Sequence, residues 1–217
     1  MGKEKKSIRK TVLLAAGLAA VITIGGISAY FTDVDSAANV FTTGKVAIEL
    51  KEPEYNARPE EHRNITPNKS LAKDPYVTNT GINDAFVFLE FTIPKATVKT
   101  ANENGSQNVA INQELFAYGI SEGWTQIVRE DGEDGCRYVY AYGTKEACKP
   151  LAAGETTPVL FSGGAIRFIN VIEGQGMEEE TLELPVEAYG IQTVDIDGGK
   201  TAPEDIWPVL ENQQTAG

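Results

Sequence analysis

A chain of 217 residues with a formal net charge of −12 fits a single domain of ordinary size. The chain has 31 Asp and Glu residues against 19 Lys and Arg. This acidic balance argues against a nucleic-acid partner, because phosphate binding needs clustered basic side chains.

The first 29 residues have the layout of an export signal. Five basic residues precede position 11, an uncharged apolar run covers 11–27, and the small residues Ser28 and Ala29 follow. We predict cleavage between Ala29 and Tyr30, which limits membrane contact to export. An uncleaved anchor is the alternative, although the run is at the short end of what spans a bilayer. Removing the leader's five basic residues and one acidic residue changes the net charge from −12 to −16.

Residues 45–217 are predicted to form one all-β domain. Alternation with a period of two over 45–51 indicates a half-buried strand, and a charged, proline-rich loop follows over 52–75. The nearly continuous apolar run 85–93 predicts a central strand buried on both faces, which Pro94 should end. Further strands are expected at 124–129, 136–142, 158–161, 165–172 and 181–193, with Gly163 and Gly164 as a break.

A short helix is expected near the C-terminus, from a cap at Thr201 to about Leu210. Its apolar side chains should pack on the edge of a sheet. Many short strands with Gly and Pro between them favour a jelly-roll-like β-sandwich. The predicted organisation is a signal peptide at 1–29, an extended segment at 30–44 and the β-sandwich at 45–217.

Two cysteines, Cys136 and Cys148, flank a predicted turn at 142–144. An exported protein permits a disulfide, so we predict a bridge across this hairpin. Two buried free thiols are the alternative, since a single pair of cysteines fixes no connectivity. The alternating stripe Tyr138, Tyr140 and Tyr142 indicates either cross-strand packing or an exposed binding face.

No catalytic, cofactor-binding or metal-binding residue is predicted. The one histidine, His62, lies in a charged stretch typical of the surface, and a zinc peptidase usually needs two histidines on a helix with a glutamate base. Three acidic spots offer oxygen ligands for calcium but lack the spacing of an EF-hand loop, so they are read as solvated turns. These spots are Asp33 with Asp35, the stretch 130–134, and Asp195 with Asp197.

Two blocks near the N-terminus carry a resemblance to a known family. Residues 26–33 read GISAYFTD, and residues 39–50 step from Asn39 through Phe41 and Gly44 into an alternating strand. These blocks resemble the TasA/camelysin family, secreted proteins of Gram-positive bacteria that a SipW-type signal peptidase processes. The resemblance is good over residues 1–95 and patchier over 150–210.

The resemblance implies a secreted structural subunit of an extracellular biofilm-matrix fibre. In such fibres a jelly-roll subunit lacks one strand and receives the N-terminal segment of a neighbour. The candidate donor is the segment 30–44, with Phe31, Val34, Val40 and Phe41 as its apolar side chains. Its partners would be further copies of the chain or paralogous matrix subunits. A disordered tail, or pairing with its own domain, is the alternative for this segment.

Two other functions remain open at this stage. The camelysin branch of the family is described as a metalloprotease, but the residues give this little support, and we expect no enzyme activity. A monomeric surface adhesin or fibre accessory protein is the second alternative. All three readings place the protein outside the cell, in the matrix or at the cell surface.

Overall fold

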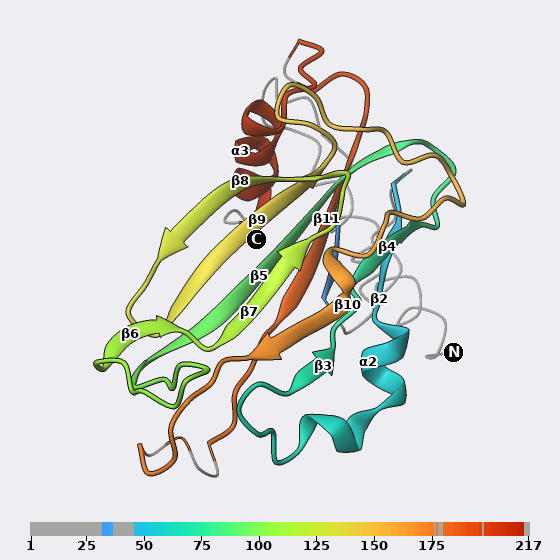
Figure 1. The fold of residues 1–217 in the computed structure, drawn as a ribbon. Helices are drawn as coiled ribbons and strands as arrows, with labels where there is room; N and C mark the ends of the chain where they lie inside the picture. Colours follow the sequence, from blue (N-terminus) through green and yellow to red (C-terminus); the bar gives the residue numbers. More distant parts are fainter. Residues whose placement is uncertain (1–31, 37–45, 176, 178–179, 197, 215–217) are drawn as a thin grey trace, which may run out of the picture.

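The computed structural model describes residues 32–36, 46–175, 177, 180–196 and 198–214 (Figure 1). Strands dominate and the helices are short, which confirms the predicted all-β, sandwich-like fold with one helix near the C-terminus. Within these ranges no helix combines the length and apolar character that crossing a bilayer requires. The elements are β1 (Thr32–Ser36), β2 (Ile48–Lys51), α2 (Pro53–Ala57), η1 (Pro59–His62), β3 (Ser70–Ala72), β4 (Tyr76–Asn79), β5 (Ala85–Val98), β6 (Ile111–Glu114), β7 (Phe116–Ile120), β8 (Trp124–Asp131), β9 (Gly135–Tyr142), β10 (Phe161–Phe168), β11 (Val186–Gln192) and α3 (Pro203–Gln214).

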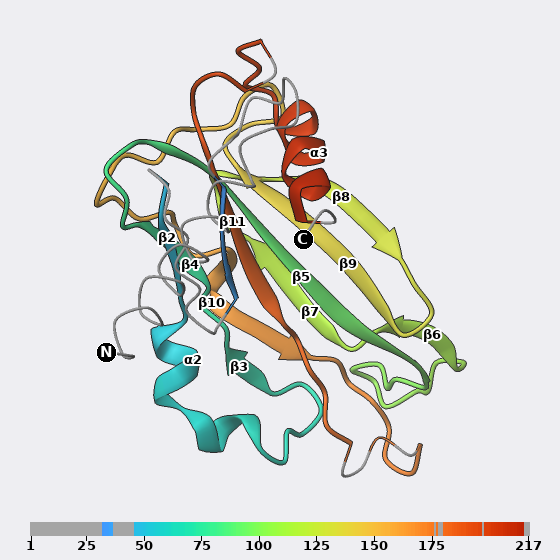
Figure 2. The ribbon, with the colours of Figure 1, turned by 180° about the vertical axis from the view of Figure 1, so that it is seen from behind.

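One large antiparallel sheet forms the centre of the fold. Its strand order is β1-β11-β5-β9-β8, and β6 pairs with the far end of β5. A three-stranded sheet, β3-β10-β7, and the β2-β4 pair make up the remaining strands. Figures 1 and 2 show α3 on one face of the large sheet and β7 with β10 on the opposite face.

Strand β5 is the central strand that its apolar run predicts. Its side chains alternate between two cores: Leu89 and Phe91 face the core shared with the smaller sheets, whereas Phe86 and Phe88 face α3. Burial on both sides removes the need for polar residues at alternate positions, which explains the nearly continuous apolar pattern.

The prediction that Pro94 ends this strand is wrong, because β5 continues to Val98. The backbone N–H of Lys95 donates to Asp134 O (2.8 Å) on the β9 side, so the nitrogen of Pro94 faces the other side. On that side β11 has already ended opposite Phe91, and the β6 pairing begins only at Lys95. Proline therefore occupies a position where the ladder needs no donor.

Strand β10 also corrects a prediction, since Gly163 and Gly164 lie inside one strand and do not separate two. Their φ angles are +69° and +64°, and the register against β7 shifts between Phe161 and Ile166. Glycine adopts positive φ without a steric penalty, so the pair forms a bulge and the strand continues beyond it. The predicted loop 52–75 likewise contains short elements, namely α2, η1 and β3.

The predicted bridge between Cys136 and Cys148 is wrong, because both residues are buried free thiols. Cys136 lies near the start of β9, whereas Cys148 pairs with Gly143 just beyond the other end of that strand. The seven residues from Cys136 to Gly143 span about 23 Å of strand, while a disulfide needs Cα atoms within about 7 Å. The hairpin partners of β9 are β8 and β5, so the turn after Tyr142 does not bring the thiols together.

The stripe Tyr138, Tyr140 and Tyr142 is buried packing, each side chain being 5–6% exposed. The rings of Tyr138 and Tyr140 stack with Phe91 at centroid distances of 5.3 and 5.7 Å. On the opposite face Trp207 of α3 contacts Phe88 and Tyr189. The helix therefore packs on the face of the sheet, where the sequence analysis had placed it at an edge.

Candidate assembly edge and apolar groove

Strand β1 lies at the edge of the large sheet and pairs there with β11 alone. The antiparallel register runs from Thr32 opposite Ile191 to Ser36 opposite Glu187. Because β5 occupies the other side of β11, the outer backbone groups of β11 depend on β1 for their strand partner. This part of the predicted donor segment is therefore a strand at the rim of its own domain.

Most of the other predicted site residues cannot be placed. Ala29, Tyr30 and Phe31, at and just after the predicted cleavage point, lie outside the described residues, as do Val40 and Phe41. Among the predicted donor residues only Val34 falls in a described strand, where its backbone lies opposite Tyr189.

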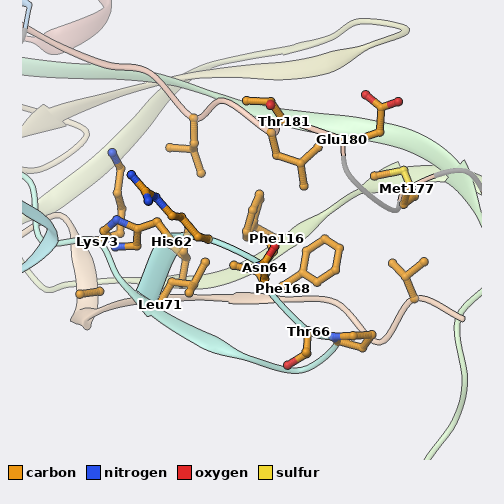
Figure 3. Close-up of a pocket in the computed structure, with 18 of the residues that line it drawn as sticks. His62, Asn64, Thr66, Leu71, Lys73, Phe116, Phe168, Met177, Glu180 and Thr181 are labelled. Atoms are coloured by element: carbon orange, nitrogen blue, oxygen red, sulfur yellow. The ribbon is translucent and has the colours of Figure 1, made fainter. Parts of the chain in front are cut away.

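An apolar groove of about 650 Å³ lies beside the smaller sheet and was not predicted from the sequence (Figure 3). Its apolar lining comes from β3, β7, β10 and the chain that leads into β11: Leu71, Phe116, Ile166, Phe168, Leu182 and Leu184. Figure 3 shows Phe116 and Phe168 together in the groove, and their ring centroids are 5.6 Å apart. Polar side chains such as Asn64, Thr66 and Thr181 also line it.

One end of the groove holds a cluster of polar and aromatic side chains. The Nζ atom of buried Lys73 lies 2.9 Å from Oε1 of Glu52 and 4.5 Å from the ring centroid of Tyr55. The ring of His62 stacks on the other ring of this cluster, Tyr55, with centroids 4.0 Å apart. Asp74 accepts backbone hydrogen bonds from Glu54 (3.0 Å) and Tyr55 (3.1 Å), which caps the first turn of α2.

His62 is half-buried, where the sequence analysis expected a solvated surface residue. Burial and the nearby Lys73 ammonium lower the pKa of its imidazole, so the neutral form is favoured. Its Nε2 atom is buried and lacks a hydrogen-bond partner. The misplacement has a simple cause: η1 folds its charged stretch against Tyr55, a contact that no periodicity in the sequence signals.

No three His, Cys, Asp or Glu side chains in the described part of the chain are grouped so that they could hold a metal ion. Two residues of the acidic turn after β8 are instead engaged by cations. Asp131 pairs with Lys95 (2.6 Å), which lowers the pKa of Asp131, and Glu130 pairs with Arg137 (3.0 Å). The side chains of Asp33 and Asp35 and the whole of Asp197 lie outside the described residues.

Comparison with known proteins identifies a family. Residues 4–113 match the model of the family described as camelysin metallo-endopeptidase, a stretch that runs from the predicted leader through β5 into β6. No curated protein and no solved structure matches the chain. The matched stretch is just over half of the sequence and includes both N-terminal blocks that carry the resemblance. The chain belongs to the camelysin metallo-endopeptidase family.

Proposed function

We propose that the mature chain is a structural subunit that assembles into an extracellular fibre by β-strand addition. Residues 30–44 of one copy act as the donor strand, and the outer edge of β11 in the next copy is the acceptor. The observation that carries this proposal is the position of β1, an edge strand held by one neighbour at the start of the mature chain. Extended segments commonly complete an open sheet edge in this way.

The pairing between β1 and β11 serves equally well within one chain or between two. Exchange of β1 keeps every backbone hydrogen bond of the register while linking the copies. Each copy then offers one donor and one acceptor, which are different surfaces. Such a head-to-tail contact continues without closing, and a filament is its natural product.

The family supports a protein of the cell surface or extracellular space. We propose export through the leader at 1–29, cleavage by a SipW-type peptidase, and deposition in a biofilm matrix. Cleavage frees Tyr30 and with it the donor segment, so processing would precede assembly.

Peptidase activity is the second candidate, because the family description names a metallo-endopeptidase. The described residues do not fit a catalytic metal centre: no ligand group is present, and His62 stacks on Tyr55 beside the cation Lys73. We derive no catalytic step from this arrangement. A protease assay with and without a chelator tests it, and chelator-sensitive cleavage by the purified chain would favour the enzyme.

The fibre proposal is tested with two purified chains, one beginning at Tyr30 and one at Ala37. The longer chain should form filaments visible by negative-stain electron microscopy, and the shorter one should not. Because the shorter chain keeps β11 but lacks β1, it should also accept one donor and stop growth, so filaments shorten when the two are mixed. Circular dichroism verifies that the shorter chain is folded. Filaments from the chain beginning at Ala37 would refute the proposal, and a monomeric longer chain would favour an accessory or adhesin role.

A further inference from the structure

The apolar groove lies directly ahead of β1 in the direction in which β1 runs. Strand β1 leaves the sheet at Ser36, opposite Glu187, at the end where the chain enters β11. Just before β11, Leu182 and Leu184 form one wall of the groove. A donor strand that continues beyond Ser36 therefore meets this wall next.

The register identifies which donor position meets which wall residue. Each pair in the observed ladder advances one residue on β1 and retreats one on β11, from Thr32 opposite Ile191 to Ser36 opposite Glu187. Continued with the same step, the ladder sets Asn39 opposite Leu184 and Phe41 opposite Leu182. Phe41 is the one large apolar residue among these groove-side positions.

The alternation of side chains places Phe41 on the correct face. In β11, Val186 and Ala188 face the core shared with the smaller sheets, and Leu182 and Leu184 pack against that same core. Directly opposed residues in an antiparallel pair project to the same face. The position opposite Leu182 thus faces the groove, whereas Val40 faces the other side.

We propose that the groove receives Phe41 of a second copy, which continues the β1–β11 pairing and packs against Phe116 and Phe168. This inference rests on the proposed fibre function and names the acceptor site of that function. The occupant is aromatic, and the lining of the groove is apolar and contains two aromatic rings.

Chain length argues that the occupant comes from another copy. Ile48 of β2 packs tightly on Gly190 of β11, where a Cβ atom would lie 3.0 Å from Ile48 Cγ2. Leu182 lies eight residues from Gly190, about 27 Å along an extended strand. The seven residues from Phe41 to Ile48 reach at most about 25 Å, so a chain whose own Ile48 holds this place cannot also seat its Phe41 beside Leu182.

Cysteine cross-linking tests this geometry, since directly opposed residues have Cα atoms about 4.5–5.5 Å apart, within disulfide range. F41C and L182C chains of different tagged mass, both beginning at Tyr30, are mixed and oxidised. We expect a dimer of unequal chains on a non-reducing gel, with the bridge between the introduced cysteines located by peptide mapping. V40C is the matched control, because it projects to the opposite face and should cross-link to L182C at least about tenfold less.

The outcomes separate this inference from the fibre proposal. Filaments that form without the F41C–L182C bridge would overturn the groove assignment and leave the fibre intact. Cross-linked dimers without filaments would support the groove and refute the fibre. A bridge confined to single chains of the F41C/L182C double variant, or equal bridging by V40C, would also overturn the inference. As a second measurement, F41D should reduce filament mass about tenfold or more while F41L retains it, and equal losses in both would count against the groove.

Discussion

Arg137 and Glu90 form a paired ion contact on the face of the large sheet that α3 covers. Nε of Arg137 lies 2.6 Å from Oε1 of Glu90, and Nη2 lies 2.9 Å from Oε2. The same guanidinium reaches Glu211 of α3 (3.3 Å) and lies 5.9 Å from the ring centroid of Trp207. One side chain therefore connects β5, β9 and the C-terminal helix.

Arg137→Met should lower the free energy of unfolding by about 2 kcal/mol, because it leaves the partly buried Glu90 carboxylate without its bidentate partner. Glu211→Gln is the matched control. It removes only the exposed end of the network and should cost less than about 0.5 kcal/mol. Urea unfolding followed by fluorescence measures both. Equal effects of the two variants would contradict the central place given to Arg137 and Glu90.

The two cysteines should behave as free, protected thiols. Burial raises the pKa of Cys148 to about 12, so almost none of it is thiolate at pH 8. The folded protein should resist alkylation, and two alkyl groups should add after unfolding in the absence of reductant. Intact-mass spectrometry measures this. A chain that accepts alkyl groups only after reduction would contain the bridge that the structure rejects.

The contrast between the cysteines and the tyrosine stripe indicates how far a sequence can be read. Alternation over 136–142 sets Tyr138 and Tyr140 on one face, because the period of a strand is two whatever its neighbours are. Whether Cys136 meets Cys148 depends on which strands flank β9. That is a long-range choice, and twelve residues of separation carry no record of it.

The groove exposes the same limit. Its lining comes from four segments separated by long intervals, each short and unremarkable alone, such as the three residues of β3. Pro94 was misread for a related reason. A proline is excluded only where the ladder needs its N–H, and the gap between β11 and β6 is set by strands distant in the sequence.

Tyr140 should make stability fall in alkaline solution. Burial raises its pKa to about 12, against an ordinary value of 10.0, so between these values the folded state holds a proton that the unfolded state has lost. The contribution is complete below pH 10 and is lost as the pH rises towards 12. Tyr140→Phe should therefore show a shallower loss of unfolding free energy between pH 9 and 11. At pH 7 it should lose only about 1 kcal/mol, from the hydrogen bond to Gln126. Equal slopes for the two proteins would contradict this.

His62 should make the fold sensitive to mild acid in the opposite sense. Its pKa lies below the ordinary 6.5 because of burial, with Lys73 adding to the shift. The unfolded chain therefore takes up a proton first as the pH falls, and the stability present above pH 6.5 is lost as the pH drops through the folded pKa. His62→Gln should reduce the loss of unfolding free energy between pH 7.5 and 5.5. Since the chain has one histidine, its ring proton resonances give the titration directly by NMR. Lys73→Met should raise the midpoint by removing the neighbouring cation, and a wild-type midpoint at or above 6.5 would show that His62 is not held in the groove as described.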